Sequence, residues 1–392
     1  MADKKTILGY LKQYLPEFEL RDGDGDAVGD IWDLITGNEE FLASTQNHGQ
    51  TMEECEAMLT ARPPQVAEEN KHFLTIYGEG ECIALLDYLE CYPDRTTVYL
   101  GLLVVEKSVQ NRGIGRELND AFMRAAAKCG YREIRLGCYA ANETGYQFWR
   151  KNRYIAEKIV EREVDGEVFP LIHMACDISD THMFESEKER KTVYRAEQEV
   201  DCRASEEMTK RAFWNKYVPG CMEHYLLHLL REGAAFVPEL SLVAEVKGKI
   251  VGGIWYSKSK VKTACAEHEV LTFGPLCVVP EYQGTGIGGY LLEKSMRLAR
   301  EAGYPGIIIL GEPEYYPKHG FVTCDKFGIT TADGKNFDAF MGLELTEGAF
   351  APMRGGKFYE AAVFGTLTEE AAAEYDRDFP QMEKLKLPGQ WN

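Results

Sequence analysis

Two glycine-rich segments of the 392-residue chain carry residues suited to binding a phosphorylated ligand. One reads Gln-Asn-Arg-Gly-Ile-Gly over residues 110–115, and the other reads Gln-Gly-Thr-Gly-Ile-Gly over residues 283–288. Each lies between an apolar run and a segment with a helical apolar stripe, which predicts strand, turn and helix. The first turn of a helix has unpaired N–H groups and the positive end of the helix dipole, and glycines let a phosphate approach closely. We therefore expect a phosphate-binding turn in each half.

Other glycine motifs fit these segments less well. Gly284 to Gly289 matches the dinucleotide pattern Gly-x-Gly-x-x-Gly, but four residues separate its first glycine from the strand, and that pattern needs an immediate turn. The first half breaks the pattern at Arg116. A Walker loop requires lysine where Tyr290 stands. Glycines that serve only a tight turn remain an alternative, although the repeated glutamine argues against it.

The repeat extends beyond the two turns. Both helical stripes end near a glycine, Gly130 or Gly303, and a short apolar run follows each, at 134–138 and at 307–310. Strand, turn, helix and strand in this order predict a parallel βαβ unit in each half. Hairpin patterns at 154–175 and 242–256 add antiparallel strands. The expected fold class is therefore α/β, as an α+β mixed sheet in each half.

Domain boundaries follow from a polar segment without apolar period. Residues 179–191 are expected to be a linker between an N-terminal domain, 1–178, and a C-terminal domain, 192–392.

Composition narrows the class of protein. The net charge is −19, from 44 Lys and Arg against 63 Asp and Glu, which disfavours nucleic acid and anionic membranes as partners. No apolar stretch is long enough to span a membrane, and the first residues lack the apolar core of a signal peptide. The 11 cysteines are scattered without a Cys-x-x-Cys pair, which is typical of reduced thiols, so we expect a cytoplasmic protein.

With these motifs, the chain resembles the GNAT N-acyltransferase superfamily. That family carries Arg/Gln-x-x-Gly-x-Gly/Ala after its fourth strand and a later Tyr-x-x-x-Gly-Phe, which residues 316–321 match. The resemblance implies acetyl-CoA as acyl donor, no metal, and a small-molecule or peptide amine as acceptor. The implied cofactor contacts are Cys277, Val278, Val279, Gln283, Gly284, Thr285, Gly286, Ile287, Gly288 and Gly289 in the second half, and Val104, Val105, Gln110, Arg112, Gly113, Gly115 and Asn142 in the first.

The resemblance also implies catalytic roles in the second half. Tyr316 occupies the position of the general acid that protonates the departing thiolate, and an ordinary tyrosine pKa near ~10 keeps it protonated at neutral pH. Glu269 is the expected base. Strand alternation sends His268 and Glu269 to opposite faces, and a bulge at Gly274-Pro275 would reverse that parity. A solvated strand end is the alternative interpretation of this segment.

The first half departs from the family pattern. Trp149 stands where the tyrosine belongs and Arg153 where the glycine belongs, and an indole N–H is a poor proton donor. Tyr146, one helical turn earlier, is the alternative acid. We therefore expect a degenerate catalytic site in this half. The predicted function is N-acetyl transfer by the second half, and the alternatives are a noncatalytic acyl-CoA-binding or sensing protein and a protein in which both halves catalyse.

Two further patterns indicate metal ligands less strongly. Cys221, His224 and His228 lie at helical spacing and could bind zinc, but no fourth ligand is evident and a packing helix, or an acceptor contact by His224, is an alternative. Residues 22–26 alternate Asp and Gly as in a calcium loop, yet Ala27 replaces the required glycine, so a helix-capping loop is favoured.

Overall fold

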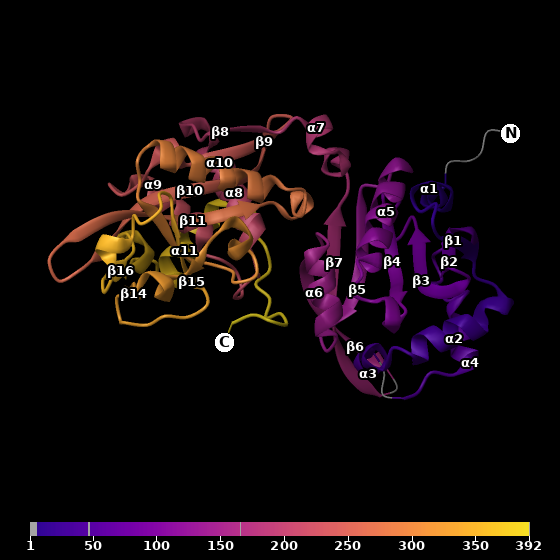
Figure 1. Ribbon diagram of the computed structural model, residues 1–392. Helices are drawn as coiled ribbons and strands as arrows, with labels where there is room; N and C mark the ends of the chain where they lie inside the picture. Colours follow the sequence, from indigo (N-terminus) through magenta and orange to yellow (C-terminus); the bar gives the residue numbers. More distant parts are fainter. Residues whose placement is uncertain (1–5, 46–47, 165, 392) are drawn as a thin grey trace. The chain divides into compact units, whose positions relative to one another are not determined.

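The computed structural model describes residues 6–45, 48–164 and 166–391 (Figure 1). They divide into two compact units. The N-terminal unit runs to Glu185 and includes Leu385–Gln390, and the C-terminal unit comprises Ser186–Lys384 with Trp391. The break between Glu185 and Ser186 falls within 179–191, where a 3₁₀ turn, Thr181–Phe184, and a short helix, α7 (Glu187–Arg190), are formed. The arginine that ends α7 is buried.

In the part of the chain that the structure describes, the N-terminal unit is one mixed sheet with six α-helices. The helices are α1 (Ile7–Tyr14), α2 (Val28–Thr36), α3 (Glu39–Thr45), α4 (Met52–Met58), α5 (Ile114–Lys128) and α6 (Glu143–Lys151). The strands are β1 (Glu19–Asp22), β2 (Lys71–Gly78), β3 (Glu81–Glu90), β4 (Thr97–Val105), β5 (Glu133–Tyr139), β6 (Ile155–Val164) and β7 (Glu167–Asp177), in the order β1-β2-β3-β4-β5-β7-β6. Among the described residues of this unit, only the β4–β5 pair is parallel.

Helices cover both faces of this sheet. Leu85 on β3 belongs to an apolar cluster with α2, whereas the Tyr88 ring on the same strand packs against Phe122 of α5. Residues three apart on a strand point to opposite faces, so α2 and α5 lie on opposite sides. The expected βαβ unit, β4-α5-β5, and the expected β6–β7 hairpin are confirmed. The hairpin's predicted turn residue Asp165 lies outside the described residues.

The C-terminal unit repeats this plan with additions. Its further helices are α8 (Cys202–Phe213), α9 (Glu223–Glu232), α10 (Ile287–Glu301) and α11 (Glu369–Tyr375). Its strands are β8 (Val193–Ala196), β9 (Leu242–Val246), β10 (Lys249–Lys262), β11 (Glu267–Val278), β12 (Gly306–Leu310), β13 (Val322–Thr323), β14 (Thr330–Thr331), β15 (Phe340–Glu344) and β16 (Lys357–Tyr359). The central order is β15-β12-β11-β10, with β9 and β8 continuing along part of β10. β11–β12 is the parallel pair of this central part, and the short strands β14 and β16 also pair in parallel. The expected mixed α/β fold class is confirmed in both units.

In each unit the parallel pair separates after a few residues. β4 pairs with β5 only from Thr97 to Leu100, although β4 continues to Val105. A register shift against β3 leaves Gly101 as an extra residue, a β-bulge, where the separation begins. β11 pairs with β12 only at Leu271, and its own shift spans Gly274 and Pro275. The bulge expected there is confirmed, but it follows Phe273, so the parity of residues 267–273 is unchanged.

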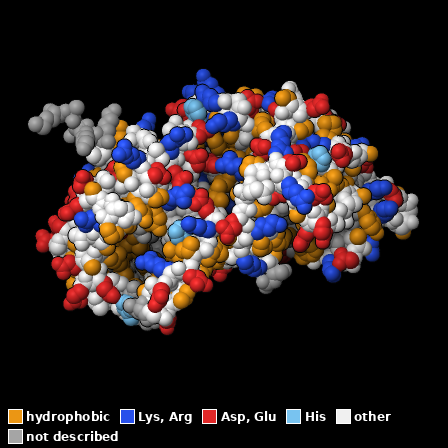
Figure 2. Space-filling view, turned by 180° about the vertical axis from the view of Figure 1, so that it is seen from behind, with side chains coloured by type: hydrophobic (Ala, Val, Ile, Leu, Met, Phe, Trp, Pro, Cys, Tyr) orange, Lys and Arg blue, Asp and Glu red, His pale blue; other side chains and the backbone are white. Residues whose placement is uncertain are grey.

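Charged side chains are spread over the visible surface, and the described helices are short or polar. The face in Figure 2 carries acidic and basic side chains interspersed. No helix within residues 6–45, 48–164 and 166–391 is long and apolar enough to cross a membrane.

A buried polar cluster joins α8 and α9 to the segment after α11. Lys210 Nζ lies 2.6 Å from the Asp376 carboxylate, and His224 Nε2 lies 3.2 Å from the same oxygen. The His224 side chain is fully buried, and the Cys221 thiol lies 3.5 Å from its other ring nitrogen. Burial lowers the pKa of His224 to about 4, because Asp376 offsets only part of the desolvation. His224 is therefore neutral in the folded protein at neutral pH.

This depressed pKa predicts a loss of stability in acid. The unfolded chain takes up a proton at His224 near pH 6.5 and the folded chain only near pH 4, so stability falls as the pH drops through that window. The contribution is about 2–3 kcal/mol. His224→Gln should reduce the difference in urea midpoint between pH 7.5 and pH 4.5, and His228→Gln, on the partly exposed side of α9, should not. Equal pH dependence in wild type and His224→Gln would contradict this assignment.

Candidate functional site

The two glycine turns have the same backbone conformation. Asn111 and Gly113 have φ of +60° and +90°, and their counterparts Gly284 and Gly286 have +74° and +89°. Gly113 and Gly286 directly precede α5 and α10, as N-caps without a side chain. A Cβ added at either residue would meet no atom within 4 Å. The turns therefore leave open space in front of the unpaired N–H groups of each helix.

The repeated glutamines brace the turns from within. The Gln110 amide donates to the Val105 carbonyl at 2.8 Å and to Asn38 Oδ1 at 2.7 Å. Gln283 donates to the Val278 carbonyl at 3.0 Å, again five residues earlier in the chain. Each amide thus ties the turn to the end of the preceding strand. Sequence reasoning took the glutamines as cofactor contacts and did not foresee this bracing role.

A cavity of about 690 Å³ opens beside the first turn, in the N-terminal unit. Six of the predicted cofactor contacts line it: Val104, Val105, Gln110, Gly113, Gly115 and Asn142. Arg112 is not among the lining residues. The turn, the free end of β4 and the start of α6 are therefore brought to one place.

The cavity exists because β4 leaves β5 at Gly101. Residues 99–105 of β4 line it, and so do Leu136 to Tyr139 at the end of β5. Asp87 lies behind Gly101, since a Cβ there would be 3.1 Å from Asp87 Oδ2. Burial raises the pKa of Asp87, and Lys71, whose Nζ lies 2.6 Å away, partly offsets this rise. Sequence reasoning missed Gly101; the lone glycine in an apolar strand was the available signal.

α6 places Trp149 at the cavity wall. Asn142 caps this helix by accepting a hydrogen bond from the Gly145 N–H at 2.8 Å. Arg153 has φ of +79°, where its counterpart Gly320 has +89°, so the backbone of the family motif is kept in both units. Tyr146, the alternative acid, is buried and is not among the cavity-lining residues. Trp149 therefore holds the position facing the cavity.

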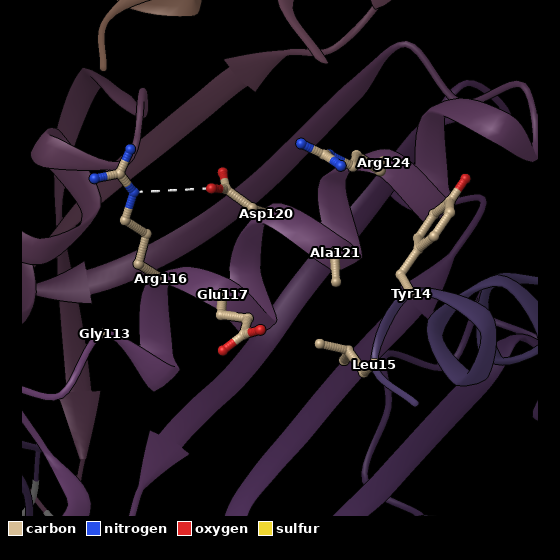
Figure 3. Close-up of a pocket in the computed structure, with 8 residues that line it drawn as sticks. All are labelled: Tyr14, Leu15, Gly113, Arg116, Glu117, Asp120, Ala121 and Arg124. Atoms are coloured by element: carbon tan, nitrogen blue, oxygen red, sulfur yellow. Dashed lines mark ion pairs between the residues drawn. The ribbon is translucent and has the colours of Figure 1, made fainter. Parts of the chain in front are cut away.

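A second hollow, of about 340 Å³, adjoins the same turn (Figure 3). It shares Gly113 and Arg116 with the larger cavity and extends between α5 and the end of α1. Arg116 pairs with Asp120 at 3.8 Å, while Arg124 lies farther along α5. Glu117 and Asp120 line the hollow together with the two arginines, so its charges balance.

In the C-terminal unit Tyr316 lies against the bulge of β11. Its ring contacts Phe273, the last residue before the bulge, and also Phe321. A Cβ on Gly311 would lie 2.3 Å from this ring, so only glycine there leaves room for it. Burial raises the pKa of Tyr316 well above its ordinary value. No hydrogen-bond partner of its hydroxyl is found in the described ranges, so the group is a protonated and available donor.

Two carboxylates, Glu312 and Glu223, act on Tyr217. Tyr217 donates to Glu312 Oε1 at 2.7 Å, and the charge of Glu312 contributes to the raised pKa of Tyr316. Glu223, at the start of α9, accepts from the Met222 N–H at 3.0 Å and forms no ion pair with any described residue. Burial raises the pKa of Glu223, and its charge helps to raise that of Tyr217. Sequence reasoning missed Glu223, because its neighbours read only as a packing helix.

Glu269 lies elsewhere on the same strand. Its carboxylate is 3.2 Å from Lys258 Nζ, and its side chain is half exposed. It is four residues from Phe273, roughly 13 Å along β11. The structure therefore does not bring Glu269 to Tyr316.

The residues of the two possible metal-binding patterns do not come together in a metal site in the described part of the chain. Among the described residues, no group of three or more His, Cys, Asp or Glu could hold a metal ion. Cys221 and His224 belong to the buried cluster with Asp376, and His228 lies 3.4 Å from Glu206 instead. Asp24 caps the 3₁₀ turn Gly25–Ala27 by accepting from the Asp26 N–H, which is the helix-capping role expected for that loop.

Models of known families match both units. A model described as "Acetyltransferase (GNAT) family" matches residues 38–153, and one described as "Acetyltransferase (GNAT) domain" matches residues 238–323. Together they span just over half of the chain, and each contains one glycine turn. The chain belongs to the GNAT family. It is a tandem member, with one GNAT domain in each unit.

Curated relatives agree with this membership. YjhQ of Escherichia coli K12, described as an uncharacterized N-acetyltransferase, is 37% identical over 99 residues, which are 25% of this chain and 55% of YjhQ. YhbS of the same strain, described in the same words, is 27% identical over 128 residues, 32% of this chain and 71% of YhbS. The chain thus spans about half the length of YjhQ.

Solved GNAT structures resemble parts of the chain. YhbS of Escherichia coli in complex with CoA is 23% identical, with a TM-score of 0.40, over 45% of this chain and 93% of that one. A GNAT acetyltransferase of Brucella melitensis in complex with acetyl-CoA is 27% identical, with a TM-score of 0.37, over 45% of this chain and 99% of that one.

The positive φ of Gly286 predicts a cost for any branched side chain there. Gly286→Val should destabilise the protein by about 1–3 kcal/mol, because L-residues rarely adopt this conformation. Gly289→Ala, inside α10 with only an ordinary contact to His319, should instead stabilise by about 0.5–1 kcal/mol. Urea unfolding of both variants gives the comparison. Equal stability of Gly286→Val and wild type would show that the turn does not need glycine.

Proposed function

We propose that the protein is an N-acetyltransferase whose C-terminal domain transfers the acetyl group of acetyl-CoA to a primary amine of a small molecule or peptide. The observation that carries this proposal is Tyr316: a half-buried, protonated hydroxyl with no hydrogen-bond partner among the described residues, set beside the bulge of β11 in a domain with an open glycine turn. Membership of the GNAT family supports acetyl-CoA as the donor.

The cofactor would lie between the glycine turn and the free part of β11. Backbone N–H groups from Gly284 to Gly289 are open to a pyrophosphate, and no Cβ at Gly286 intrudes. Beyond the bulge, Cys277, Val278 and Val279 are no longer paired with β12, so the pantetheine arm could lie along this stretch. The Val279 N–H already donates to the Val251 carbonyl and the Val278 carbonyl accepts from Gln283, so the arm would use the remaining peptide groups. Burial raises the pKa of Cys277 to about 12, which keeps it a thiol and not a competing nucleophile.

The reaction needs one proton donor and one proton acceptor. The neutral amine attacks the thioester carbonyl, the C–S bond breaks as the C–N bond forms, and the thiolate of CoA takes the proton of Tyr316. The proton lost by the amine passes to a carboxylate. The raised pKa keeps Tyr316 protonated at neutral pH but also makes it a weaker acid, so its proton moves only to a strongly basic thiolate that forms as the C–S bond breaks.

We assign the acceptor of that proton to Glu223. Its carboxylate is half-buried and forms no ion pair among the described residues, and its charge acts on Tyr217 and Cys277, two residues that interact electrostatically with Tyr316. Glu269, the base expected from the sequence, is ion-paired and far along the strand. A raised pKa makes Glu223 a stronger base than an exposed glutamate.

The N-terminal domain supports a binding role. Its cavity holds the glycine turn and the separated strand end, but Trp149 faces it where the C-terminal domain has Tyr316. An indole N–H does not protonate a thiolate, so we propose that this domain binds acyl-CoA and does not transfer. A protein in which both domains only bind would be the alternative, and the same assay decides between them. A cytoplasmic location remains a prediction from the unpaired use of cysteines.

Tyr316→Phe should lower acetyl transfer far more than Trp149→Phe. The first change removes a proton donor and keeps the ring, so turnover should fall about 10²–10⁴-fold. An acyl donor with a better leaving group should shrink that loss. Thiol release from acetyl-CoA against a panel of amines measures it, with Tyr359→Phe on exposed β16 as the matched hydroxyl control. Near-full turnover of Tyr316→Phe, together with loss in Trp149→Phe, would place transfer in the N-terminal domain.

The variants Glu223→Gln and Glu269→Gln distinguish which of the two carboxylates accepts the proton of the amine. Glu223→Gln should lower kcat about 10²-fold and remove the acidic limb of the kcat profile, because activity falls as pH drops through the raised pKa of Glu223. Glu269→Gln should keep both rate and profile, since its partner Lys258 lies on the exposed strand. If Glu269→Gln alone alters the acidic limb, the base is the one expected from the sequence.

A further inference from the structure

The large cavity of the N-terminal domain is positively charged in a strongly acidic protein. Four charged side chains line it, Glu40, Arg116, Lys151 and Arg162, so cations outnumber anions by three to one among the described lining residues. The chain as a whole carries −19. A cavity of opposite sign to its protein favours an anionic ligand.

One of these cations lies beside the glycine turn. Arg116 is in the first turn of α5. The phosphates of an acyl-CoA bound at the turn would use it, as the proposed function requires, so Arg116 needs no second anion to explain it. Lys151 lines the cavity from the last residue of α6.

Arg162 is too distant to share that role. It lies on β6, and the sheet order places β5 and β7 between β6 and the free end of β4. Three strand spacings amount to about 14 Å. Arg162 forms no ion pair with any residue of the described ranges, and its guanidinium lies 5.9 Å from the centre of the Tyr139 ring. A cation that lines a cavity without a carboxylate partner is available to an anionic ligand.

The walls next to Arg162 are apolar and aromatic. Tyr139 packs edge-on against Phe169, which is the register partner of Arg162 on β7. Tyr99 and Leu171 complete this end, and their side chains meet over Gly137, where a Cβ would be 3.1–3.2 Å from both. Phe41 lines the cavity from α3. The end of the cavity next to Arg162 can therefore enclose the ring or the branched chain of a ligand.

We propose that this end of the cavity binds a small carboxylate with an apolar body, its carboxylate on Arg162 and its body between the aromatic walls. Arginine presents two parallel N–H donors that match a carboxylate, and Tyr139 holds the guanidinium from the side. Arg162 lies on β6, three strands along the sheet from β4 and the glycine turn that follows it, so the site is separate from the acyl-CoA phosphates. It belongs to the N-terminal domain and does not depend on transfer by Tyr316.

Calorimetry on the full-length protein tests this site with three probes: 3-phenylpropionate, its neutral analogue 3-phenylpropanamide, and inorganic phosphate. Wild type should bind 3-phenylpropionate at least tenfold more tightly than the amide, because only the acid can pair with Arg162. Arg162→Gln should abolish that preference, and Arg162→Lys should keep part of it. The matched control is Arg132→Gln, an exposed arginine just before β5 that is not among the cavity-lining residues.

The alternatives give different results. Equal binding of acid and amide, or no loss in Arg162→Gln, would overturn the assignment of Arg162. Phosphate that displaces 3-phenylpropionate at equal concentration would show a general anion site and would overturn the carboxylate specificity. The test reads binding alone, so a Tyr316→Phe variant that has lost transfer should still bind 3-phenylpropionate as wild type does. Failure of the proposed transfer and failure of this site are therefore distinguishable.

Discussion

The separation of one parallel strand pair in each sheet is the constraint on which both sites depend. A parallel ladder satisfies backbone groups evenly along its length, so two parallel strands part only where something interrupts the register. Here a bulge does so, at Gly101 in β4 and at Gly274-Pro275 in β11. The residues after each bulge have backbone groups without a strand partner on one side. That is where a ligand can add its own hydrogen bonds, and where the glycine turn that follows directs its open N–H groups.

Duplication has kept this backbone and changed the chemistry around it. Arg153 adopts the left-handed φ that Gly320 adopts in the second domain, although a side chain makes that conformation less favourable. The motif's geometry therefore persists in the N-terminal domain even where its residues do not. What differs is the group that faces the cleft, an indole at Trp149 and a hydroxyl at Tyr316. This difference supports the proposal that the N-terminal domain binds acyl-CoA and that the C-terminal domain transfers the acetyl group.

The acceptor side of the C-terminal domain is fixed by charges buried far from the glycine turn. Lys210 on α8, His224 on α9 and Asp376 after α11 converge within hydrogen-bond range. A buried charge that loses its partner is costly, so this cluster holds α9 in one position. Glu223 is the residue before His224 on α9, so fixing α9 also fixes the position of the Glu223 carboxylate. The buried, neutral histidine is therefore a positioning residue for the proposed base and not a zinc ligand.

The sequence by itself determined the repeat, the mixed α/β class, the two glycine turns and the helices that they open, because these are local patterns of turn chemistry and apolar period. It also indicated the bulge at Gly274-Pro275, since Gly and Pro interrupt a ladder wherever they stand. Only the tertiary structure decided which side chains meet. It separated Glu269 from Tyr316, because their distance depends on how far a strand runs past its bulge. It placed Glu223, with its raised pKa, on a different element from Glu269, and it set Arg162 across the sheet from Arg116 through a strand order that no local pattern records.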